Sequence, residues 1–179
     1  MEADMISKTM QEAINEQINK ELYSSYLYLS MAAYFENENL PGFAKWMHVQ
    51  ADEERGHGMK LYEHLVDRGG RVVMKAIAAP AAGWKSNLEV FKEVQAHEEA
   101  VTASINNLYE MALKEKDYPA QVLLQWFITE QVEEEKNAGE IVQQLELIDA
   151  HGTAVLMLDN QLGKPWQVLV FEICSHGKI

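Results

Sequence analysis

The sequence has a single cysteine, Cys174, and only 4 prolines among its 179 residues. One cysteine excludes an internal disulfide framework and is typical of proteins from a reducing compartment. With so few prolines and only 10 glycines, turn signals are rare and clustered, which indicates long helices. No run approaches the ~18 apolar residues of a membrane span, and residues 1–10 carry no apolar signal core. We therefore expect a soluble, cytoplasmic protein.

Positive charge is also scarce. The chain has 15 lysines and arginines against 28 aspartates and glutamates, which amounts to a formal net charge of −13. Nucleic acids and anionic membranes are bound by clusters of lysine and arginine, so neither is an expected partner, whereas cations are compatible with such a chain. A hydrophobic content of 47% over this length predicts one well-buried domain and not a disordered chain.

Four long segments repeat apolar residues with the period of an amphipathic helix. They cover residues 7–36, 43–68, 87–116 and 117–148, and a shorter helical segment follows at 152–161. Ser7 and Asp117 are suitable N-caps, and Pro41 with Gly42 predicts the end of the first segment. Strand alternation competes only in "WQVLVFEI", at 166–173. The pattern therefore predicts an all-α protein.

The connections between these segments predict their arrangement. The first and third joints need only a few residues, so each pair of segments is expected to form an antiparallel hairpin. The middle connection, 71–86, has no helical rhythm, and its 16 residues can extend on the order of 50 Å. A helix of 26 residues is only roughly 39 Å long, so the connection can run the full length of the bundle. We therefore predict a four-helix bundle with one long crossover, followed by a short fifth helix.

Polar residues interrupt the apolar stripe of every long segment near its middle. A buried stripe recurs in steps of three and four residues, and at these steps the interruptions are Glu21 and Ser25, then Gln50, Glu54 and His57, then Glu98, and last Gln131 and Glu134. An offset of 77 residues maps Glu21, Glu53, Glu54 and His57 onto Glu98, Glu130, Gln131 and Glu134. The two hairpins therefore resemble an internal repeat whose polar groups meet at one depth.

This polar layer needs a compensating charge. A single buried glutamate or histidine is usually paired with a neighbour or turned outward, but several carboxylates at one depth repel each other and are costly to bury. No lysine or arginine lies on the four stripes at that depth. A multivalent cation would resolve the repulsion, and oxygen ligands with one imidazole suit iron or manganese and also admit zinc. The pattern predicts a dinuclear metal site.

Four stretches carry a resemblance to a known family. They are "ELYSSYLYLSMA" (21–32), "DEERGH" (52–57), "HEE" (97–99) and "LLQWFITEQVEEEK" (123–136). Through them the chain resembles the non-haem ferritins of the prokaryotic type, over roughly residues 5–162. The fold that this resemblance implies is the ferritin-like four-helix bundle with its fifth helix, over residues 1–162. The tail, 163–179, lies outside the resemblance and has no predicted role.

The resemblance implies a role for individual residues. A ferroxidase centre would hold one iron through Glu21 and His57, and Glu54 would bridge it to a second iron bound by Glu98. Gln131 would lie near the bridging oxygen species. Tyr28 would lie beside the centre as a hydrogen-bond donor or electron source, although a plain core tyrosine is an equal alternative. A third, more exposed iron site, through which iron passes inward, would consist of Glu53, Glu130, Glu133 and Glu134.

Two departures narrow the class within this resemblance. Gln131 and Glu134 stand where a haem-containing bacterioferritin or a rubrerythrin repeats Glu-x-x-His. Arg55 stands where a bacterioferritin has its haem-ligating methionine, so no haem is expected. The implied function is an iron-storage ferroxidase that oxidises Fe(II) with dioxygen or hydrogen peroxide. Its ferric mineral would be stored inside a cage of 24 subunits, with the fifth helix packed around a symmetry axis.

Three alternatives remain. A rubrerythrin-like di-iron peroxidase is disfavoured because the second Glu-x-x-His is missing and the sequence contains no Cys-x-x-Cys pair. A DNA-protecting mini-ferritin is disfavoured because its basic tail is absent and its metal sites lie between subunits. A purely structural bundle with a degenerate site is disfavoured by the 77-residue register of the polar groups.

Overall fold

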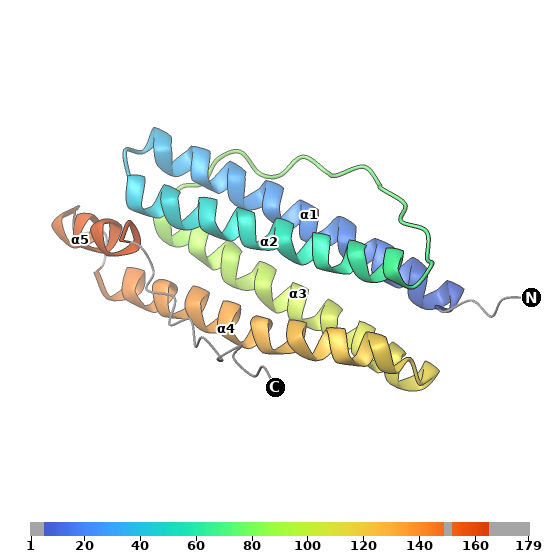
Figure 1. Ribbon diagram of the computed structural model, residues 1–179. Coiled ribbons are helices and arrows are strands. Elements are labelled where there is room, and N and C mark those ends of the chain that lie inside the picture. The colour runs from blue at the N-terminus through green and yellow to red at the C-terminus, as the bar shows by residue number, and fades with distance from the viewer. Residues whose placement is uncertain (1–5, 149–151, 165–179) are drawn as a thin grey trace, which may run out of the picture.

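The computed structural model describes residues 6–148 and 152–164, and within these ranges the chain forms helices and no strands (Figure 1). The helices are α1 (Lys8–Asn37), α2 (Pro41–Asp67), α3 (Asn87–Glu115), α4 (Tyr118–Ile148) and α5 (Gly152–Leu162). The prediction of an all-α protein is confirmed. No described helix is both long and apolar enough to span a bilayer. The strand considered at 166–173 and nearly all of the tail lie outside the described residues.

The helix ends follow from local capping chemistry. Ser7 caps α1, since its hydroxyl accepts a hydrogen bond of 3.0 Å from the backbone N–H of Met10. Asp117 acts in the same way at the start of α4, where its carboxylate accepts the N–H of Ala120 at 3.1 Å. One boundary differs from the prediction. α2 begins at Pro41, two residues earlier than the apolar pattern predicts, because a proline without an N–H is well suited to the first helical position.

The long crossover is confirmed. α1 and α2 form one antiparallel hairpin and α3 and α4 another, and the connection between the hairpins runs beside α1 along the bundle (Figure 1). Near its start, the buried side chain of Asn15 donates to the carbonyl of Arg71 at 3.0 Å and accepts the N–H of Val73 at 2.7 Å. Further along, Ser30 donates to the carbonyl of Ala81 at 2.6 Å. The connection is therefore bonded to α1 at both of these levels.

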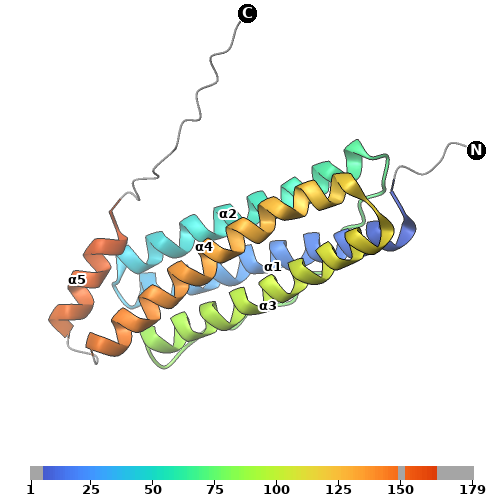
Figure 2. The same ribbon diagram turned by 90° about the horizontal axis from the view of Figure 1, so that it is seen from below.

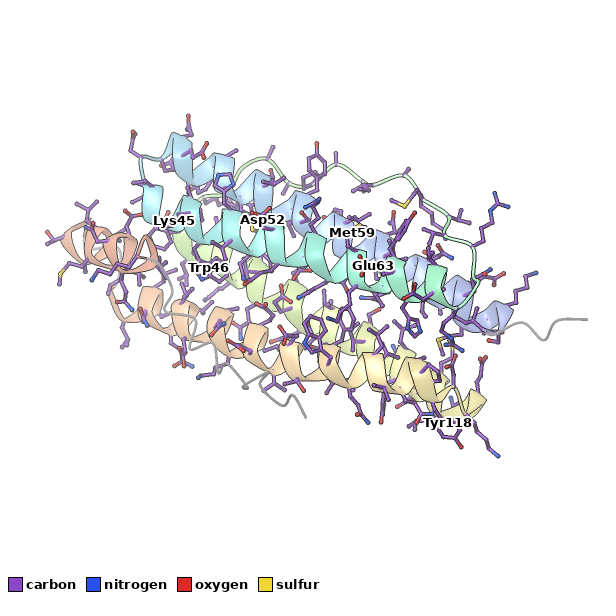
Figure 3. All side chains as sticks on the ribbon, in the orientation of Figure 1. Lys45, Trp46, Asp52, Met59, Glu63 and Tyr118 are labelled. Atoms are coloured by element: carbon purple, nitrogen blue, oxygen red, sulfur yellow. The ribbon has the colours of Figure 1, made fainter. Side chains whose placement is uncertain are left out.

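The core consists of two apolar clusters separated by a polar layer. Side chains fill the space between the four long helices along the whole bundle (Figure 3). One cluster, toward α5, contains the stacked rings of Phe35 and Phe43, whose centroids are 5.0 Å apart. The other, toward the opposite end, contains Ile14, Leu61 and Phe127. The polar residues predicted to interrupt the apolar stripes are all buried, except for Ser25, which is half-buried.

α5 lies across one end of the bundle (Figure 2) and is tied to the start of α2. Leu40, the residue before α2, provides no side-chain cap. Instead, Asp159 of α5 accepts the backbone N–H groups of Gly42 and Phe43 at 2.8 and 3.0 Å. A β-carbon at Gly42 would lie 1.7 Å from the carbonyl oxygen of Asp159, so only glycine permits this approach. The contact fixes where the fifth helix sits.

Candidate metal centre

The polar layer at mid-length contains buried side chains from all four long helices. Its members are Gln17, Glu21 and Ser24 of α1, Gln50, Glu54 and His57 of α2, Glu98 of α3, and Gln131 and Glu134 of α4. Of the groups predicted to meet at one depth, Glu21, Glu54 and His57 lie close together, and Gln131 donates a hydrogen bond to Glu98. Four of them are carboxyl groups, and they lie between the two apolar clusters.

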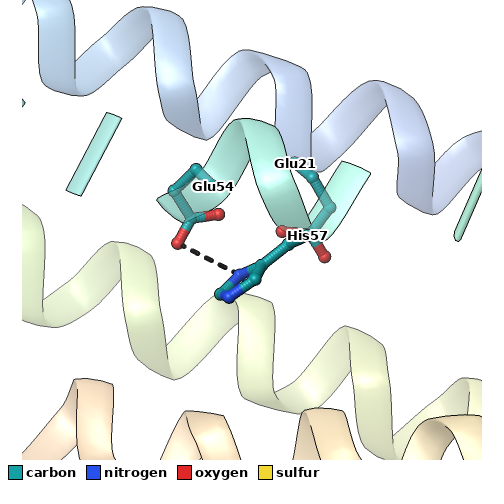
Figure 4. Close-up of side chains that lie close together, drawn as sticks. All are labelled: Glu21, Glu54 and His57. Carbon is teal, nitrogen blue, oxygen red and sulfur yellow. Dashed lines mark ion pairs between the residues drawn. The ribbon is translucent and has the colours of Figure 1, made fainter. Parts of the chain in front are cut away.

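Three of the predicted ligands form a close group. One ligand atom each from Glu21, Glu54 and His57 lies within 4.8 Å of the others (Figure 4). Glu54 and His57 are three residues apart on α2 and so share a face. Glu21 reaches them from α1, which packs against α2 beside Gly58. A β-carbon at Gly58 would lie 3.4 Å from that of Glu21.

This group has unsatisfied polar atoms. One carboxylate oxygen of Glu21, one of Glu54 and the Nδ1 of His57 are buried without a hydrogen-bond partner. The Nδ1 of His57 lies 3.7 Å from the other oxygen of Glu54, which is too long for a hydrogen bond. Buried polar atoms without partners are costly and uncommon in native proteins. Two carboxylates and one imidazole whose ligand atoms lie within 4.8 Å of one another fit a cation such as iron or manganese.

Glu98 lies on the other side of the layer, and both of its carboxylate oxygens accept hydrogen bonds. Tyr28, which is fully buried, donates its hydroxyl proton to one oxygen. Gln131 donates from its amide to the other oxygen at 3.1 Å. Tyr28 is itself held between the rings of Trp46 and His97, with edge-to-face centroid distances of 6.5 and 6.1 Å. The structure thus places Tyr28 and Gln131 as donors to a predicted metal ligand.

Burial and mutual repulsion raise the pKa of several carboxyl groups in the layer. The pKa of Glu21 is well above its usual value, first because of burial and then because of the charge of Glu54. The pKa of Glu54 is raised by burial and then by the charge of Glu98. Burial, and then Glu98, raises the pKa of Glu134 to about 8. Without a cation, the layer therefore retains protons at neutral pH.

The residues predicted for a third iron site do not form a close group. Glu53 and Glu133 are exposed, Glu130 is half-buried, and Glu134 is buried with 7% of its surface exposed. Among residues 6–148 and 152–164, the close group of possible metal ligands contains only Glu21, Glu54 and His57. Glu134 thus lies in the core, as its place on the α4 stripe predicts, and not at the surface.

Some members of the layer were not predicted from sequence. Gln17 donates to Glu21 at 2.8 Å, and its position one helical turn before Glu21 was the available signal. Ser24 lies 2.7 Å from the ring nitrogen Nε2 of His97, which packs beside Tyr28. That contact joins α1 to α3, and no spacing within one helix could have revealed it.

Fold and site together define a helical-bundle protein with a candidate metal site built from carboxylates and one imidazole. The profile of the ferritin-like domain matches residues 11–148. The chain therefore belongs to the ferritin family of iron-storage proteins, and the resemblance on which the sequence-based predictions rest is confirmed.

Individual relatives and structures agree with this assignment. The chain is 42% identical to a bacterial non-heme ferritin of Bacteroides fragilis over 160 residues, which covers 89% of this chain and 99% of the relative. A bacterial non-heme ferritin of Staphylococcus aureus is 39% identical over 159 residues, covering 89% and 96%. Among solved structures, an open pore ferritin from Archaeoglobus fulgidus is 49% identical with a TM-score of 0.88, covering 88% of this chain and 98% of that one. An engineered closed form of the same ferritin has a TM-score of 0.87 at 49% identity, covering 88% and 96%.

Proposed function

We propose that this protein is an iron-storage ferroxidase. In this proposal Fe(II) binds as substrate in the polar layer, gives up one electron per ion to dioxygen or hydrogen peroxide, and is stored as ferric mineral inside a cage. The observation that carries the proposal is the set of three unsatisfied ligand atoms of Glu21, Glu54 and His57, buried in a bundle of the ferritin family. The non-heme ferritin relatives do not favour the rubrerythrin-like alternative.

The proposed roles divide the layer between two Fe(II) positions. Glu21 and His57 hold the first ion, Glu98 holds the second, and Glu54 bridges them. Support comes from the charge of Glu54, which raises the pKa of Glu21, and from the charge of Glu98, which raises the pKa of Glu54, because Glu54 interacts in this way with both of the other carboxyl groups. Each oxygen of Glu98 accepts one hydrogen bond, from Tyr28 or from Gln131, and keeps a second lone pair with which it can bind an ion. The two donors then hold the carboxylate of Glu98 in place.

We further propose that Glu53, Glu130, Glu133 and Glu134 relay iron between the centre and the cavity. Their exposure is graded, from the buried Glu134 through Glu130 to the exposed Glu53 and Glu133. The charges of Glu98, Glu53, Glu130 and Glu133 all raise the pKa of Glu134. Glu134 thus interacts electrostatically both with Glu98, the proposed ligand of the second iron, and with the carboxylates nearer the surface.

We propose that the cage contains 24 subunits, carries no haem and works in the cytoplasm. Support for close assembly comes from large apolar side chains that are exposed in the single chain, among them Leu147 at 84% and Met157 at 70%. Such surfaces are expected to be covered by neighbouring subunits.

Arg55, at the position of the haem-ligating methionine of bacterioferritins, is an exposed side chain that cannot ligate haem iron.

An anaerobic Fe(II) titration followed by exposure to air tests the proposal. We expect at least two Fe(II) ions to bind per chain, and we expect their oxidation on mixing with air to be much faster than that of free Fe(II) in the same buffer. Stopped-flow absorbance measures the second step. Weak or undetectable binding before oxygen is added, or oxidation at the rate of the buffer alone, would refute the ferroxidase assignment.

A further inference from the structure

A continuous chain of hydrogen bonds leads from the surface of the bundle to one of the proposed iron ligands. The ammonium group of Lys20 donates to the hydroxyl of Ser104 at 2.6 Å. That hydroxyl donates to the side-chain oxygen of Gln17 at 2.6 Å. The amide nitrogen of Gln17 then donates to Oε1 of Glu21 at 2.8 Å. Lys20, Gln17 and Glu21 lie on α1 and Ser104 on α3, so the chain joins the two hairpins.

The positive charge of Lys20, at the surface, determines which group donates and which accepts in each of these hydrogen bonds. An ammonium group can only donate, so the hydroxyl of Ser104 accepts from Lys20 and has its own proton left to donate onward. This proton meets the oxygen of the Gln17 amide, which directs the amide nitrogen toward Glu21. Gln17 is only 1% exposed, so water does not compete for its amide. Bonds aligned in one direction polarise and strengthen each other.

The series of hydrogen bonds ends on one of the two carboxylate oxygens of Glu21 and leaves the other oxygen without a hydrogen bond. Oε1 accepts the hydrogen bond from Gln17, whereas Oε2 is buried without a partner. Glu21 belongs to the close group with Glu54 and His57, and Oε2 is its oxygen that has no hydrogen-bond partner. The chain therefore selects which oxygen of Glu21 remains available as a ligand and fixes the plane of its carboxylate.

The second hairpin has no equivalent of this series of hydrogen bonds. The 77-residue offset places Val94, a fully buried apolar residue, at the position equivalent to Gln17. Glu98, the equivalent of Glu21, is held by Tyr28 and Gln131 instead. Any effect of these hydrogen bonds is therefore confined to the Glu21 side of the polar layer.

We propose that Gln17, oriented by Ser104 and Lys20, is the positioning residue for the first Fe(II) position. It holds Glu21 through Oε1 so that Oε2 alone is offered to the metal beside His57. The inference rests on the proposed function and extends it, because it predicts that a side chain without metal contact sets the affinity of one position and not of the other.

A double-mutant cycle on the assembled full-length protein tests this, with Co(II) as an oxygen-stable probe whose visible absorption reports its ligands. We expect Gln17→Leu to weaken one of the two Co(II) binding steps by about tenfold, in the range typical of lost partners of metal ligands, and to change the absorption spectrum. Ser104→Ala should weaken the same step by several-fold, and Ser104→Thr should restore it. In the Gln17→Leu background, Ser104→Ala should have no further effect, because its action passes through Gln17.

A further pair of variants tests the surface end of these hydrogen bonds. Lys20→Met is the test variant and Lys8→Met is its matched control, since both remove an exposed lysine from α1. Lys20→Met should weaken the first position, and Lys8→Met should not. Unchanged affinity and spectrum in the Gln17→Leu and Ser104→Ala variants, or additive effects in the double variant, would overturn the inference alone. Absence of Co(II) and Fe(II) binding in the wild-type protein would overturn the proposed function as well. If Gln17→Leu fails to assemble, the pair Ser104→Ala and Ser104→Thr still decides the question.

Discussion

Glu54 and His57 occupy positions on the α2 stripe at which apolar side chains would stabilise a metal-free bundle. Neither side chain is satisfied by the protein alone, since each has a buried atom without a hydrogen-bond partner. Groups that are costly to bury and yet lie together at the centre of a core mark a functional site. A cation bound in this layer, as we propose, would recover the stability that the bundle loses there.

Substitution of these ligands separates activity from folding. We expect Glu54→Ala and His57→Ala to slow Fe(II) oxidation about tenfold or more, because each removes a ligand from a site of few ligands. The metal-free Glu54→Ala protein should unfold at a higher temperature than the wild type, because a repelled buried carboxyl is gone. Stopped-flow absorbance and thermal unfolding by circular dichroism measure the two effects. Glu99→Ala, an exposed carboxylate on α3, is the control, and wild-type rates in both ligand variants would contradict the site assignment.

The raised pKa values predict an unusual dependence of stability on pH. Glu134 binds its proton up to about pH 8 in the folded state, whereas in the unfolded chain its pKa is near the ordinary value of 4.5. Between these values the folded state binds more protons, so the free energy of unfolding of the metal-free protein falls as pH rises. We expect a loss of a few kcal/mol from pH 5.5 to pH 8, since one pKa unit corresponds to about 1.4 kcal/mol.

Urea unfolding with a chelator present, at both pH values, measures this difference. Glu21 and Glu54 also have raised pKa values and act in the same direction. Glu134→Gln should therefore reduce the dependence without abolishing it. Stability that increases from pH 5.5 to pH 8 in the wild-type protein would show that these carboxyls are paired or hydrated and not held in a repulsive layer.

The candidate ligands and their neighbours Tyr28 and Gln131 could be predicted from the sequence, but the hydrogen bonds of Gln17 and Ser104 that support Glu21 could not. The apolar period of the helices is interrupted at Glu21, Glu54, His57 and Glu98. An interruption of this kind can be recognised in the sequence alone. Ser104 of α3 donates to Gln17 of α1, and such a contact across helices depends on the rotation of each helix about its axis. Residues that only support the site therefore need the structure to be found.

At the scale of elements, the connection between Asp159 and the start of α2 links the fifth helix to the bundle. The short fifth helix was predicted from its period, at 152–161, and found at Gly152–Leu162. Its attachment could not be predicted, because the two bonded partners are separated by 117 residues in the chain. The start of α2 differs from the prediction because a proline is typical of the end of one helix but also fits the first position of the next, which is where Pro41 lies.

Removal of this cap should loosen α5 selectively. We expect Asp159→Ala to destabilise the protein by about 1–2 kcal/mol, since two buried N–H groups of α2 lose their acceptor. Hydrogen exchange should accelerate in α5 and in the first turn of α2, while α3 remains protected. Asp52→Ala, which removes an exposed aspartate from the same face of α2 as Met59 and Glu63 (Figure 3), serves as the control. Equal exchange in α5 of both variants would mean that its apolar contacts suffice to hold it.

At the scale of the whole molecule, storage differs from simple redox turnover in capacity. A di-iron enzyme saturates at its fixed ligands, whereas a cage provides volume for mineral. The net charge of −13 suits an acidic inner wall that attracts Fe(II). The related ferritins from Archaeoglobus fulgidus, one with an open pore and one engineered to a closed form, indicate that cages of this kind can differ in how tightly they close.

Iron transfer to the cavity should depend on the acidic relay. We expect the double variant Glu130→Ala with Glu133→Ala to slow continued iron loading more than it slows the first turnover of oxidation, because the centre itself remains intact. The matched control is Glu99→Ala with Glu110→Ala, which removes two exposed carboxylates from α3. If both steps slow equally in the relay variant, or the control behaves alike, the relay assignment fails.

Aerobic loading of the wild-type protein followed by size exclusion tests the central claim most directly. We expect one large assembly at about twenty-four times the 20.4 kDa chain, as the symmetric cage of 24 subunits predicts. Stepwise addition of Fe(II) should load far more than two irons per chain, and the ferric mineral should elute together with the protein. A monomer or dimer that stops at two irons per chain would contradict storage, even if its centre oxidises iron.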